Sequence, residues 1–536
     1  MSLDDTLLNR FVEQIDPVDG DAPASHTHGG FGRETHWAAV VQKPLCFNPP
    51  RPLKRRRSSE VGTLPITRGH PTPAEPDVRG QAATAVAETL ADSDVEEVAP
   101  PGPSNAAEVP WQNLDDLHLA NLKIFGNARF RDRQEAICRA ALANKDCFVL
   151  MPTGGGKSLC FQLPSVLTPG LSLVISPLIS LMVDQVKALV DKDFPATYLS
   201  SNQTETDRKA VYRELRKQVP SCKLLYVTPE QLVKSEALRD ILSALYGRGM
   251  LSRLVVDEAH CISAWGHDFR KEYQSIGKVR ADHFPNLPVM ALTATATKAV
   301  QRDVKRSLGM KEGRLAMFQV SFNRPNIFWR VVCKEEGNTS GGVPKNVKSI
   351  AEYIQGKWAG QSGIVYCLTR EDTEVTATFL REEFGIQATF YHAGLTTKQR
   401  NAIQIGFKEG DVAVICATIA FGMGVDNPHV RFVVHQSIPK SLEGYYQEAG
   451  RAGRDGRPAE ALLMYSPDDV RRNRNLINSG KVGKKQRETQ YEKLDLMQVY
   501  CLEKEDCRRC HVLRYFGESF QASECRRTCD NCKNVR

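Results

Sequence analysis

The 536-residue sequence lacks a run of 18 apolar residues, so we expect no membrane-spanning helix. Residues 1–5 include neither a basic cluster nor a long apolar stretch, which argues against a secretory signal peptide. Without such a signal, the 15 cysteines are expected to be reduced thiols or metal ligands rather than disulfides. A formal charge of +8 permits a polyanionic partner without requiring one. A hydrophobic content of 41% excludes a wholly disordered or fibrous chain.

Residues 1–112 differ from the rest in composition. The first 110 residues hold 14 of the 29 prolines, with 10 basic and 16 acidic residues, a net charge of −6 that leaves 8 − (−6) = +14 for the remainder. Such a segment buries too little surface to offset its ordering entropy, so we predict that it is disordered. Within it, Leu7–Ile15 has the spacing of an amphipathic helix that docks on a partner or forms only transiently. The basic run Lys54–Arg57 indicates nuclear import or a nonspecific polyanion contact.

Short apolar runs alternate with polar helical stretches in two successive series. Runs of this kind are typical of strands buried on both faces of a parallel sheet. We therefore predict an α/β chain with one lobe at 113–318, a second at 319–466, and a helical, Cys-rich region at 467–536. The predicted strands are Cys147–Met151, Leu171–Ser176, Lys223–Val227, Leu254–Val256 and Val289–Thr293, then Gly363–Cys367, Ala388–Tyr391, Val412–Cys416, Phe432–His435 and Ala461–Tyr465.

A glycine-rich loop follows the first predicted strand and precedes a helical stretch at 159–167. The loop reads Met-Pro-Thr153-Gly154-Gly155-Gly156-Lys157-Ser158, with Met where the usual phosphate-loop pattern opens on Gly. Glycines let backbone N–H groups surround a triphosphate, and Lys157 can reach the β- and γ-phosphates. The Ser158 hydroxyl is suited to Mg²⁺. The alternative is a merely flexible glycine turn.

A pair of carboxylates follows the predicted strand at 254–256. Asp257 can hold Mg²⁺, and Glu258 can orient and deprotonate the attacking water. Acidic pairs after a strand are common, but this one accompanies a phosphate loop. Together the two elements predict a Mg²⁺-ATP hydrolysis site.

Asp257-Glu258-Ala259-His260 and the following Cys-Ile-Ser-Ala-Trp-Gly-His-Asp-Phe-Arg resemble the DEAH box and aromatic-rich loop of RecQ-family, superfamily 2 DNA helicases. The resemblance covers residues 120–532 and is strongest to the Bloom-syndrome type. It implies two RecA-like lobes, a small helical zinc domain, 3′-to-5′ unwinding powered by ATP, and a nuclear role in DNA repair, recombination and replication. It also implies that Arg131 and Gln134 recognise adenine and that Ser176 contacts the tracked DNA strand.

Further family motifs occur in the second predicted lobe. The segment ending in Asp426 resembles the motif at the lobe interface, and Gln447–Gly456 resembles the arginine-finger motif. Arg451 and Arg454 are spaced three apart, which predicts a shared helix face. The resemblance directs both toward ATP, with Gln447 beside them, and leaves open which arginine contacts the γ-phosphate. The alternative is a solvated arginine pair.

The aromatic-rich loop has two interpretations. Trp265, Phe269 and Tyr273 are spaced by four, which on a helix would form a stripe typical of a core. The resemblance instead favours a loop in which Trp265, Phe269 and Arg270 meet single-stranded DNA by stacking and charge.

Six cysteines follow residue 500 and predict a zinc site. Cys507/Cys510 and Cys529/Cys532 are both CxxC pairs, which suits a simple ribbon. The resemblance instead selects Cys507, Cys525, Cys529 and Cys532, with Cys510 on the buried side of a helix. The rival quartet replaces Cys525 with Cys510.

The sequence departs from the Bloom type because it stops four residues after Cys532, where those proteins usually continue into a winged helix. We therefore expect weaker unwinding but intact ATP hydrolysis. The expected partners are single-stranded and tailed or forked DNA and, by family, topoisomerase III or a single-strand-binding protein at Leu7–Ile15. The alternatives are a translocating ATPase that does not unwind, an RNA helicase, and a regulatory protein that competes with a full-length helicase.

Overall fold

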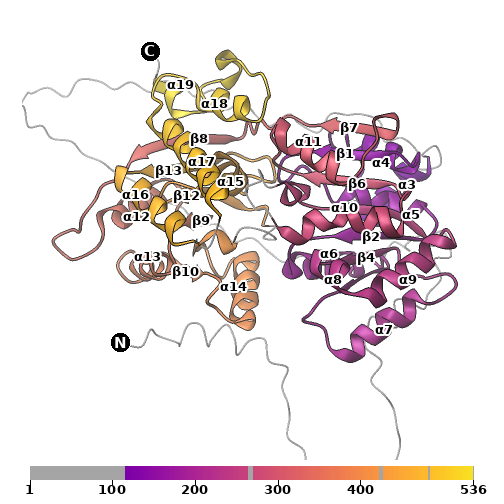
Figure 1. The fold of residues 1–536 in the computed structure, drawn as a ribbon. Coiled ribbons are helices and arrows are strands. Elements are labelled where there is room, and N and C mark those ends of the chain that lie inside the picture. Colours follow the sequence, from indigo (N-terminus) through magenta and orange to yellow (C-terminus); the bar gives the residue numbers. More distant parts are fainter. Residues whose placement is uncertain (1–114, 264–269, 422–426, 481–482, 535–536) are drawn as a thin grey trace, which may run out of the picture. The chain divides into compact units, whose positions relative to one another are not determined.

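The computed structural model describes residues 115–263, 270–421, 427–480 and 483–534. The predictions for 1–112, including Leu7–Ile15 and Lys54–Arg57, lie outside these residues, as do those for Trp265, Phe269 and Asp426. The described residues form two parallel β-sheets with helices, followed by a helical C-terminal region (Figure 1).

The first sheet has seven strands in the order β3-β4-β2-β5-β6-β1-β7, and every pairing is parallel. Its strands are β1 (Asp146–Leu150), β2 (Leu171–Ile175), β3 (Ala196–Leu199), β4 (Leu224–Val227), β5 (Leu251–Val256), β6 (Val289–Thr293) and β7 (Leu315–Gln319). Its helices are α3 (Asp116–Phe125), α4 (Gln134–Leu142), α5 (Leu159–Leu167), α6 (Ile179–Val190), α7 (Glu205–Leu215), α8 (Pro229–Lys234), α9 (Glu236–Gly247), α10 (Lys271–His283) and α11 (Lys298–Ser307), with 3₁₀ turns η2 (Ala259–Ile262) and η3 (Glu312–Arg314).

The second sheet has six strands in the order β10-β11-β9-β12-β13-β8, again all parallel. Its strands are β8 (Ile327–Cys333), β9 (Ser362–Tyr366), β10 (Ala388–Tyr391), β11 (Val414–Ala417), β12 (Val430–His435) and β13 (Ala459–Tyr465). Its helices are α12 (Lys345–Lys357), α13 (Arg370–Glu382), α14 (Thr397–Glu409) and α15 (Leu442–Ala449), with the 3₁₀ turn η4 (Ile419–Phe421).

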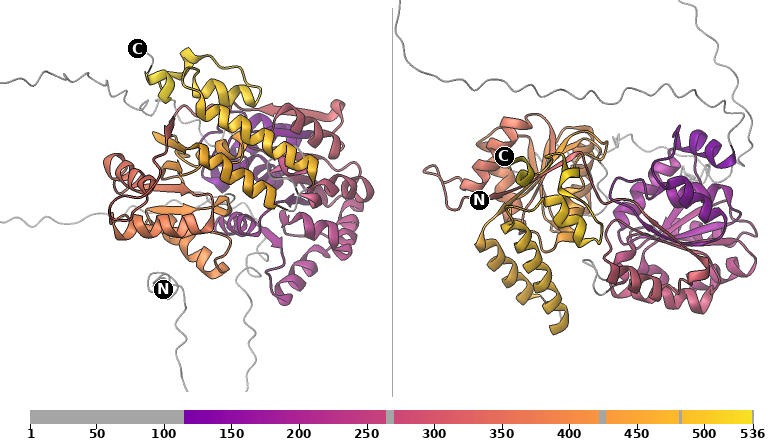
Figure 2. Two further views of the ribbon diagram at one scale, coloured as in Figure 1. Left: turned by 60° about the vertical axis from the view of Figure 1, so that its left-hand side comes forward. Right: turned by 90° about the horizontal axis from the view of Figure 1, so that it is seen from above.

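The C-terminal region is helical. It comprises α16 (Pro467–Ser479), α17 (Lys484–Leu502), α18 (Arg508–Tyr515), η5 (Ala522–Cys525) and α19 (Asp530–Asn534). The long helices α16 and α17 lie side by side (Figure 2). No helix in the described part of the chain is both long and apolar enough to cross a membrane.

Central strands are buried on both faces, which explains their continuous apolar runs. Along β1, Phe148 and Leu150 enter one core cluster, whereas Cys147 and Val149 enter another. Alternate side chains of a strand point to opposite faces, so both faces of this strand are covered. The α/β prediction with two parallel-sheet lobes is therefore confirmed.

All ten predicted runs overlap strands, and the runs at Val289–Thr293 and Ala388–Tyr391 match to the residue. The predictions missed β3, β7 and β8. All three are edge strands, and β7 is at best half-buried along its length. An edge strand needs no continuous apolar run, so the pattern used for the interior strands could not find them.

Candidate active site and zinc site

The phosphate loop at 151–158 connects β1 to α5, as predicted. Gly154 and Gly156 adopt left-handed conformations with φ of 82° and 83°. A Cβ on Gly156 would lie 2.3 Å from Nε2 of Gln134, and one on Gly155 would lie 2.6 Å from Cγ of Met151. Side chains would strain or block this loop, so its shape depends on the three glycines.

Lys157 lies folded over this loop. Its Nζ donates to the carbonyls of Met151 at 3.2 Å and Pro152 at 3.5 Å. Burial lowers the pKa of Lys157, while the charges of Glu258 and Asp257 oppose that shift. The ammonium group is thus held beside the acidic pair, where it can exchange two weak carbonyl contacts for phosphate oxygens.

The acidic pair stands at the carboxyl end of β5. The amide of Asp257 donates to the Ile175 carbonyl at 2.9 Å, and the amide of Glu258 donates to Oδ1 of Asp257 at 3.0 Å. Glu258 adopts a left-handed conformation with φ of 47°, unusual for a residue with a side chain. Burial, followed by the charge of Glu258, raises the pKa of Asp257 to about 7. A strained backbone at Glu258 and a raised pKa at the adjacent Asp257 mark a functional-site candidate.

His260 connects this pair to the next strand. Its Nδ1 lies 2.9 Å from Oγ1 of Thr293 at the end of β6 and 3.3 Å from Oε2 of Glu258. The hydroxyl of Tyr273 on α10 donates to the Asp257 carbonyl at 3.0 Å. The Glu258 carboxylate and the Asp257 backbone carbonyl therefore contact residues that follow them, His260 and Tyr273 near the start of α10.

The predicted adenine-site residues lie against the phosphate loop. Nε2 of the buried Gln134 donates to the Gly156 carbonyl at 3.2 Å, and its Oε1 accepts from the Arg131 amide at 2.8 Å. The Arg131 guanidinium donates to the Gly154 carbonyl at 3.0 Å. Both residues hydrogen-bond the loop, and their contact with adenine stays a prediction.

The predicted arginine pair does not share a helix face. Helix α15 carries Gln447 but ends at Ala449, and both Arg451 and Arg454 lie in the turns that follow. The left-handed Gly453 (φ 59°) lies within these turns, and such a conformation cannot continue a right-handed helix. The prediction of one helical face was therefore wrong.

The two arginines have different surroundings. Cγ of Arg454 lies 3.3 Å from the position of a Cβ on Gly154, and the charge of Arg454 helps to lower the pKa of Lys157. Arg451 is buried, and it lies close enough to the buried Tyr366 at the end of β9 for its charge to act on the pKa of that hydroxyl. Arg454 is thus the arginine whose contact with the phosphate loop can be traced.

Two predicted DNA-binding residues are described. Ser176, at the end of β2, is only 1% exposed. The Arg270 guanidinium, next to α10, donates to the Pro177 carbonyl at 2.7 Å. Arg270 therefore attaches the end of the aromatic-rich segment to the segment after β2, and DNA contact by either residue stays a prediction. Tyr273 is fully buried on α10, whereas Trp265 and Phe269 lie outside the described residues.

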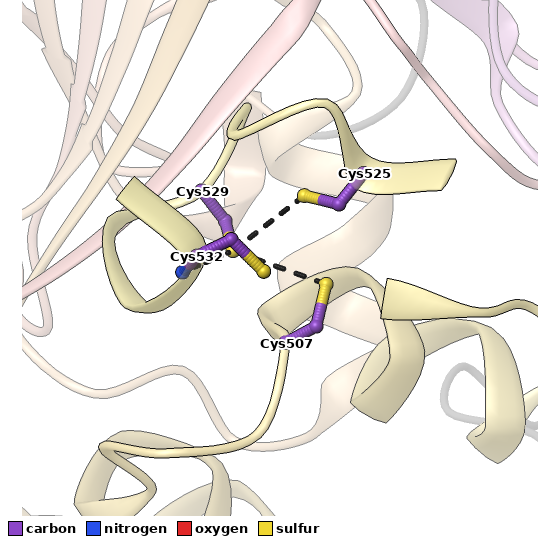
Figure 3. Close-up of side chains that lie close together, drawn as sticks. All are labelled: Cys507, Cys525, Cys529 and Cys532. Atoms are coloured by element: carbon purple, nitrogen blue, oxygen red, sulfur yellow. Dashed lines mark hydrogen bonds between the residues drawn. The ribbon is translucent and has the colours of Figure 1, made fainter. Parts of the chain in front are cut away.

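Cys507, Cys525, Cys529 and Cys532 converge in the C-terminal region (Figure 3). Their sulfur atoms all lie within 4.8 Å of one another, including separations of 3.7 Å for Cys525–Cys529 and 3.9 Å for Cys507–Cys529. Four thiolates at ~2.3 Å from a tetrahedral zinc would stand ~3.8 Å apart, so the cluster fits the ion. Cys510 is half-buried rather than buried and donates to the Phe520 carbonyl at 3.3 Å. The cluster is thus the predicted quartet and not its rival.

Sequence reasoning missed the residues that join this region to the ATP site. Arg324 contacts the phosphate loop, while Arg509 and Glu518 contact the segment around Arg324. The one local signal was the polar run Asn323-Arg324-Pro-Asn326 between two strand series. That run marks a loop but does not identify the carbonyls it contacts.

Family models match three successive segments of the chain. They are the DEAD/DEAH box helicase at 131–303, the helicase conserved C-terminal domain at 345–456, and the RecQ zinc-binding model at 467–533.

Solved helicases share the fold at low sequence identity. Helicase Lhr of Mycobacterium smegmatis, bound to single-stranded DNA and AMP-PNP, gives a TM-score of 0.53 at 17% identity, covering 77% of this chain and 57% of that one. Dbp5 of S. cerevisiae, bound to RNA and ADP BeF3, gives 0.51 at 16% identity, covering 72% and 98%. These structures show the two-lobed fold, and the family models over 131–303 and 345–456 assign the chain to the class of DEAD/DEAH box helicases.

Curated relatives narrow the class. RecQ-like DNA helicase BLM of Xenopus laevis is 46% identical over 76% of this chain and 30% of its own length. ATP-dependent DNA helicase Q-like 4B of Arabidopsis thaliana is 42% identical over 80% and 38%. ATP-dependent DNA helicase Q1 of Mus musculus is 39% identical over 81% and 64%. The chain belongs to the RecQ family of helicases. It spans about a third of the length of the frog and plant relatives.

Proposed function

We propose that this protein is an ATP-dependent DNA helicase with 3′-to-5′ polarity. One observation carries the proposal: Lys157, Glu258, Asp257 and Arg454 are close enough that the other three charges all act on the Lys157 ammonium. A cation on a phosphate loop, two acids after a strand and a second cation from another segment are the parts needed for phosphoryl transfer to water.

Each group has a role in the proposed site. Lys157 binds the β- and γ-phosphates over the amides of Thr153 and the three glycines that follow it. Ser158 and Asp257 hold Mg²⁺, whose charge offsets that of the phosphates. Glu258 orients and deprotonates the attacking water. Magnesium fits this position because a buried carboxyl with a raised pKa gains a counter-charge when the ion arrives.

The second half of the site comes from residues beyond 420. Arg454 is the arginine finger in this proposal, since its side chain packs on Gly154. Arg451, Gln447 and Asp426 support it, and Arg131 with Gln134 select adenine. ATP then engages groups from both lobes, and loss of the γ-phosphate releases them.

DNA is the proposed track. In this proposal a single strand of DNA passes beside Ser176. Its bases stack on Trp265 and Phe269, and its phosphates pair with the charge of Arg270. The zinc region, 467–536, supports the second lobe (319–466), which follows the first (113–318). The basic run at Lys54–Arg57 and the named relatives support action in the nucleus, and Leu7–Ile15 is the proposed docking helix for a protein partner.

The test compares ATP hydrolysis without nucleic acid, with single-stranded DNA and with RNA, alongside unwinding of duplexes with a 3′ or a 5′ tail. We expect DNA-stimulated hydrolysis and unwinding of the 3′-tailed duplex, both absent in Lys157→Ala. Preferential stimulation by RNA, or unwinding from the 5′ tail, would contradict the proposal.

Two further results would change its scope. Stimulated hydrolysis without strand separation would make the chain a translocase. A wild-type protein that binds DNA but never hydrolyses ATP would favour the regulatory interpretation.

A further inference from the structure

The segment between β7 and β8 carries an arginine that contacts two loops of the ATP site. Nη1 of the half-buried Arg324 donates to the Thr153 carbonyl at 3.2 Å and to the Gly450 carbonyl at 2.9 Å. Its Nη2 donates to the carbonyls of Ala452 at 3.0 Å and Gly453 at 2.9 Å. One guanidinium thus connects the residue before Gly154 to the segment that surrounds Arg451.

These acceptors are backbone oxygens, so the contact depends on shape. A guanidinium offers five N–H donors in a fixed plane, whereas a lysine ammonium is a point donor on a flexible stem. Burial lowers the pKa of Arg324, and the charge of Arg454 acts in the same direction. The position therefore holds a charge at a cost, and the four hydrogen bonds offset it.

The C-terminal region holds this segment from its other side. Arg509 lies in the first turn of α18, two residues after the zinc ligand Cys507. It donates through Nη1 to the Arg324 carbonyl at 2.7 Å and through Nη2 to the Ile327 carbonyl at 2.6 Å. Oε2 of Glu518 accepts from the Phe322 amide at 2.7 Å, and Phe516 stacks on Phe322 at 4.7 Å between ring centroids. The zinc region therefore fixes the backbone of residues 322–327, and the side chain of Arg324 extends from this segment to the loops of the ATP site.

We propose that Arg324 is a positioning residue for ATP hydrolysis, which sets the arginine-finger segment against the phosphate loop, and that Glu518 and Arg509 act through it. The inference rests on the proposed ATPase. Arg324 does not bind nucleotide in this scheme. It fixes the distance between the Thr153 carbonyl and the Gly450–Gly453 turns, so that Arg454 meets the γ-phosphate in a productive pose.

The experiment uses the full chain with zinc bound and compares Arg324→Ala, Arg324→Lys and Arg330→Ala. Arg330 is the matched control because it is an exposed arginine on the adjoining strand, 3.9 Å from Glu460. We expect Arg324→Ala to lower kcat about 100-fold, the scale of a misplaced catalytic group, while KM for ATP changes by less than about threefold. Arg324→Lys should recover a small part of kcat, and Arg330→Ala should match wild type.

Two readouts separate positioning from simple unfolding. Zinc content and melting temperature of Arg324→Ala should stay near the wild-type values, and amide exchange in residues 450–457 should accelerate even without ATP. Glu518→Gln should lower kcat by itself and add little in the double variant with Arg324→Ala.

Three outcomes would overturn the inference. They are an unchanged kcat in Arg324→Ala, a loss of kcat that only follows a loss of melting temperature, and independent addition of the Arg324 and Glu518 effects. If the wild type does not hydrolyse ATP, the proposed function fails, and the exchange measurement still decides whether Arg324 tethers the 450–457 turns.

Discussion

The two parallel sheets share a fold, yet the charged residues near their strand ends differ: the first sheet has a pair of carboxylates there, and the second has a pair of arginines. The first sheet presents Asp257 and Glu258 after β5. The second sheet places Arg451 beside Tyr366 at the end of β9, and Arg454 follows in the same turns. Ligands of parallel α/β sheets bind at the carboxyl ends of strands, where residues after each strand can vary without disturbing the core. Neither sheet alone therefore has the complete set of charges for phosphoryl transfer.

The largest expected effect comes from removing Lys157, the cation that lies beside Asp257 and Glu258 in the first lobe. Lys157→Ala deletes the ammonium that faces the phosphates, so we expect at least about a 1000-fold loss of ATP hydrolysis. DNA binding, measured by fluorescence anisotropy, should stay within about threefold of wild type. Retained turnover would show that the site is not built on this loop.

The second comparison is between the two arginines. Arg454 contacts Gly154, so Arg454→Ala should lower kcat about 1000-fold, the scale of a lost arginine finger. Arg451 is buried and its charge acts on the nearby Tyr366, so Arg451→Ala should lower kcat less and the melting temperature more. Single-turnover hydrolysis measures the effect on catalysis in both variants, and thermal unfolding measures the effect on melting temperature. The reverse ranking would move the finger to Arg451.

Much of this arrangement could be predicted from sequence because it is local. The phosphate loop and the acidic pair each occupy a few consecutive residues after a buried apolar run, and the structure keeps them there. The helix assigned to Arg451 and Arg454 failed because a spacing of three does not exclude a turn, and Gly453 is left-handed. Arg324 could not be found because its four acceptors are carbonyls up to 171 residues away, and a carbonyl carries no side-chain signature.

The zinc quartet shows the same limit from the opposite side. CxxC spacing alone left Cys510 and Cys525 as rivals, because spacing does not say which thiol turns toward the other pair. The fold resolves them: Cys525 lies 3.7 Å from Cys529, whereas Cys510 donates to the Phe520 carbonyl. Cys507 is the cap residue before helix α18, with a ψ of 126° outside the helical range, whereas Cys510 lies within the helix, so the two side chains need not share a face.

The third prediction tests whether Cys525 rather than Cys510 is a zinc ligand, and how far the stability of the protein depends on the bound zinc. Metal analysis should find one zinc per chain in wild type and in Cys510→Ser, and less in Cys525→Ser. Because zinc binding contributes to the free energy of folding, the melting temperature of Cys525→Ser should be several degrees lower than that of the wild type. Loss of zinc in Cys510→Ser with retention in Cys525→Ser would restore the rival quartet.

The smallest effect concerns the pH dependence of the acidic side. The pKa of Asp257 is raised from 3.8 to about 7, so the folded protein without Mg²⁺ holds a proton there that the unfolded chain releases above about pH 4. Stability from this group is therefore greatest at low pH and falls as the pH rises from about 4 to 7. Asp257→Asn removes the ionisation and should flatten that part of the curve in urea unfolding.

Activity should show the opposite sign. Mg²⁺ needs the ionised carboxylate, so at subsaturating Mg²⁺-ATP the value of kcat/KM should rise by up to about tenfold per pH unit below 7 and level off above it. Saturating Mg²⁺ should move the midpoint to lower pH, since the ion competes with the proton for Asp257. A midpoint that ignores the Mg²⁺ concentration would assign the titration to a group away from the metal.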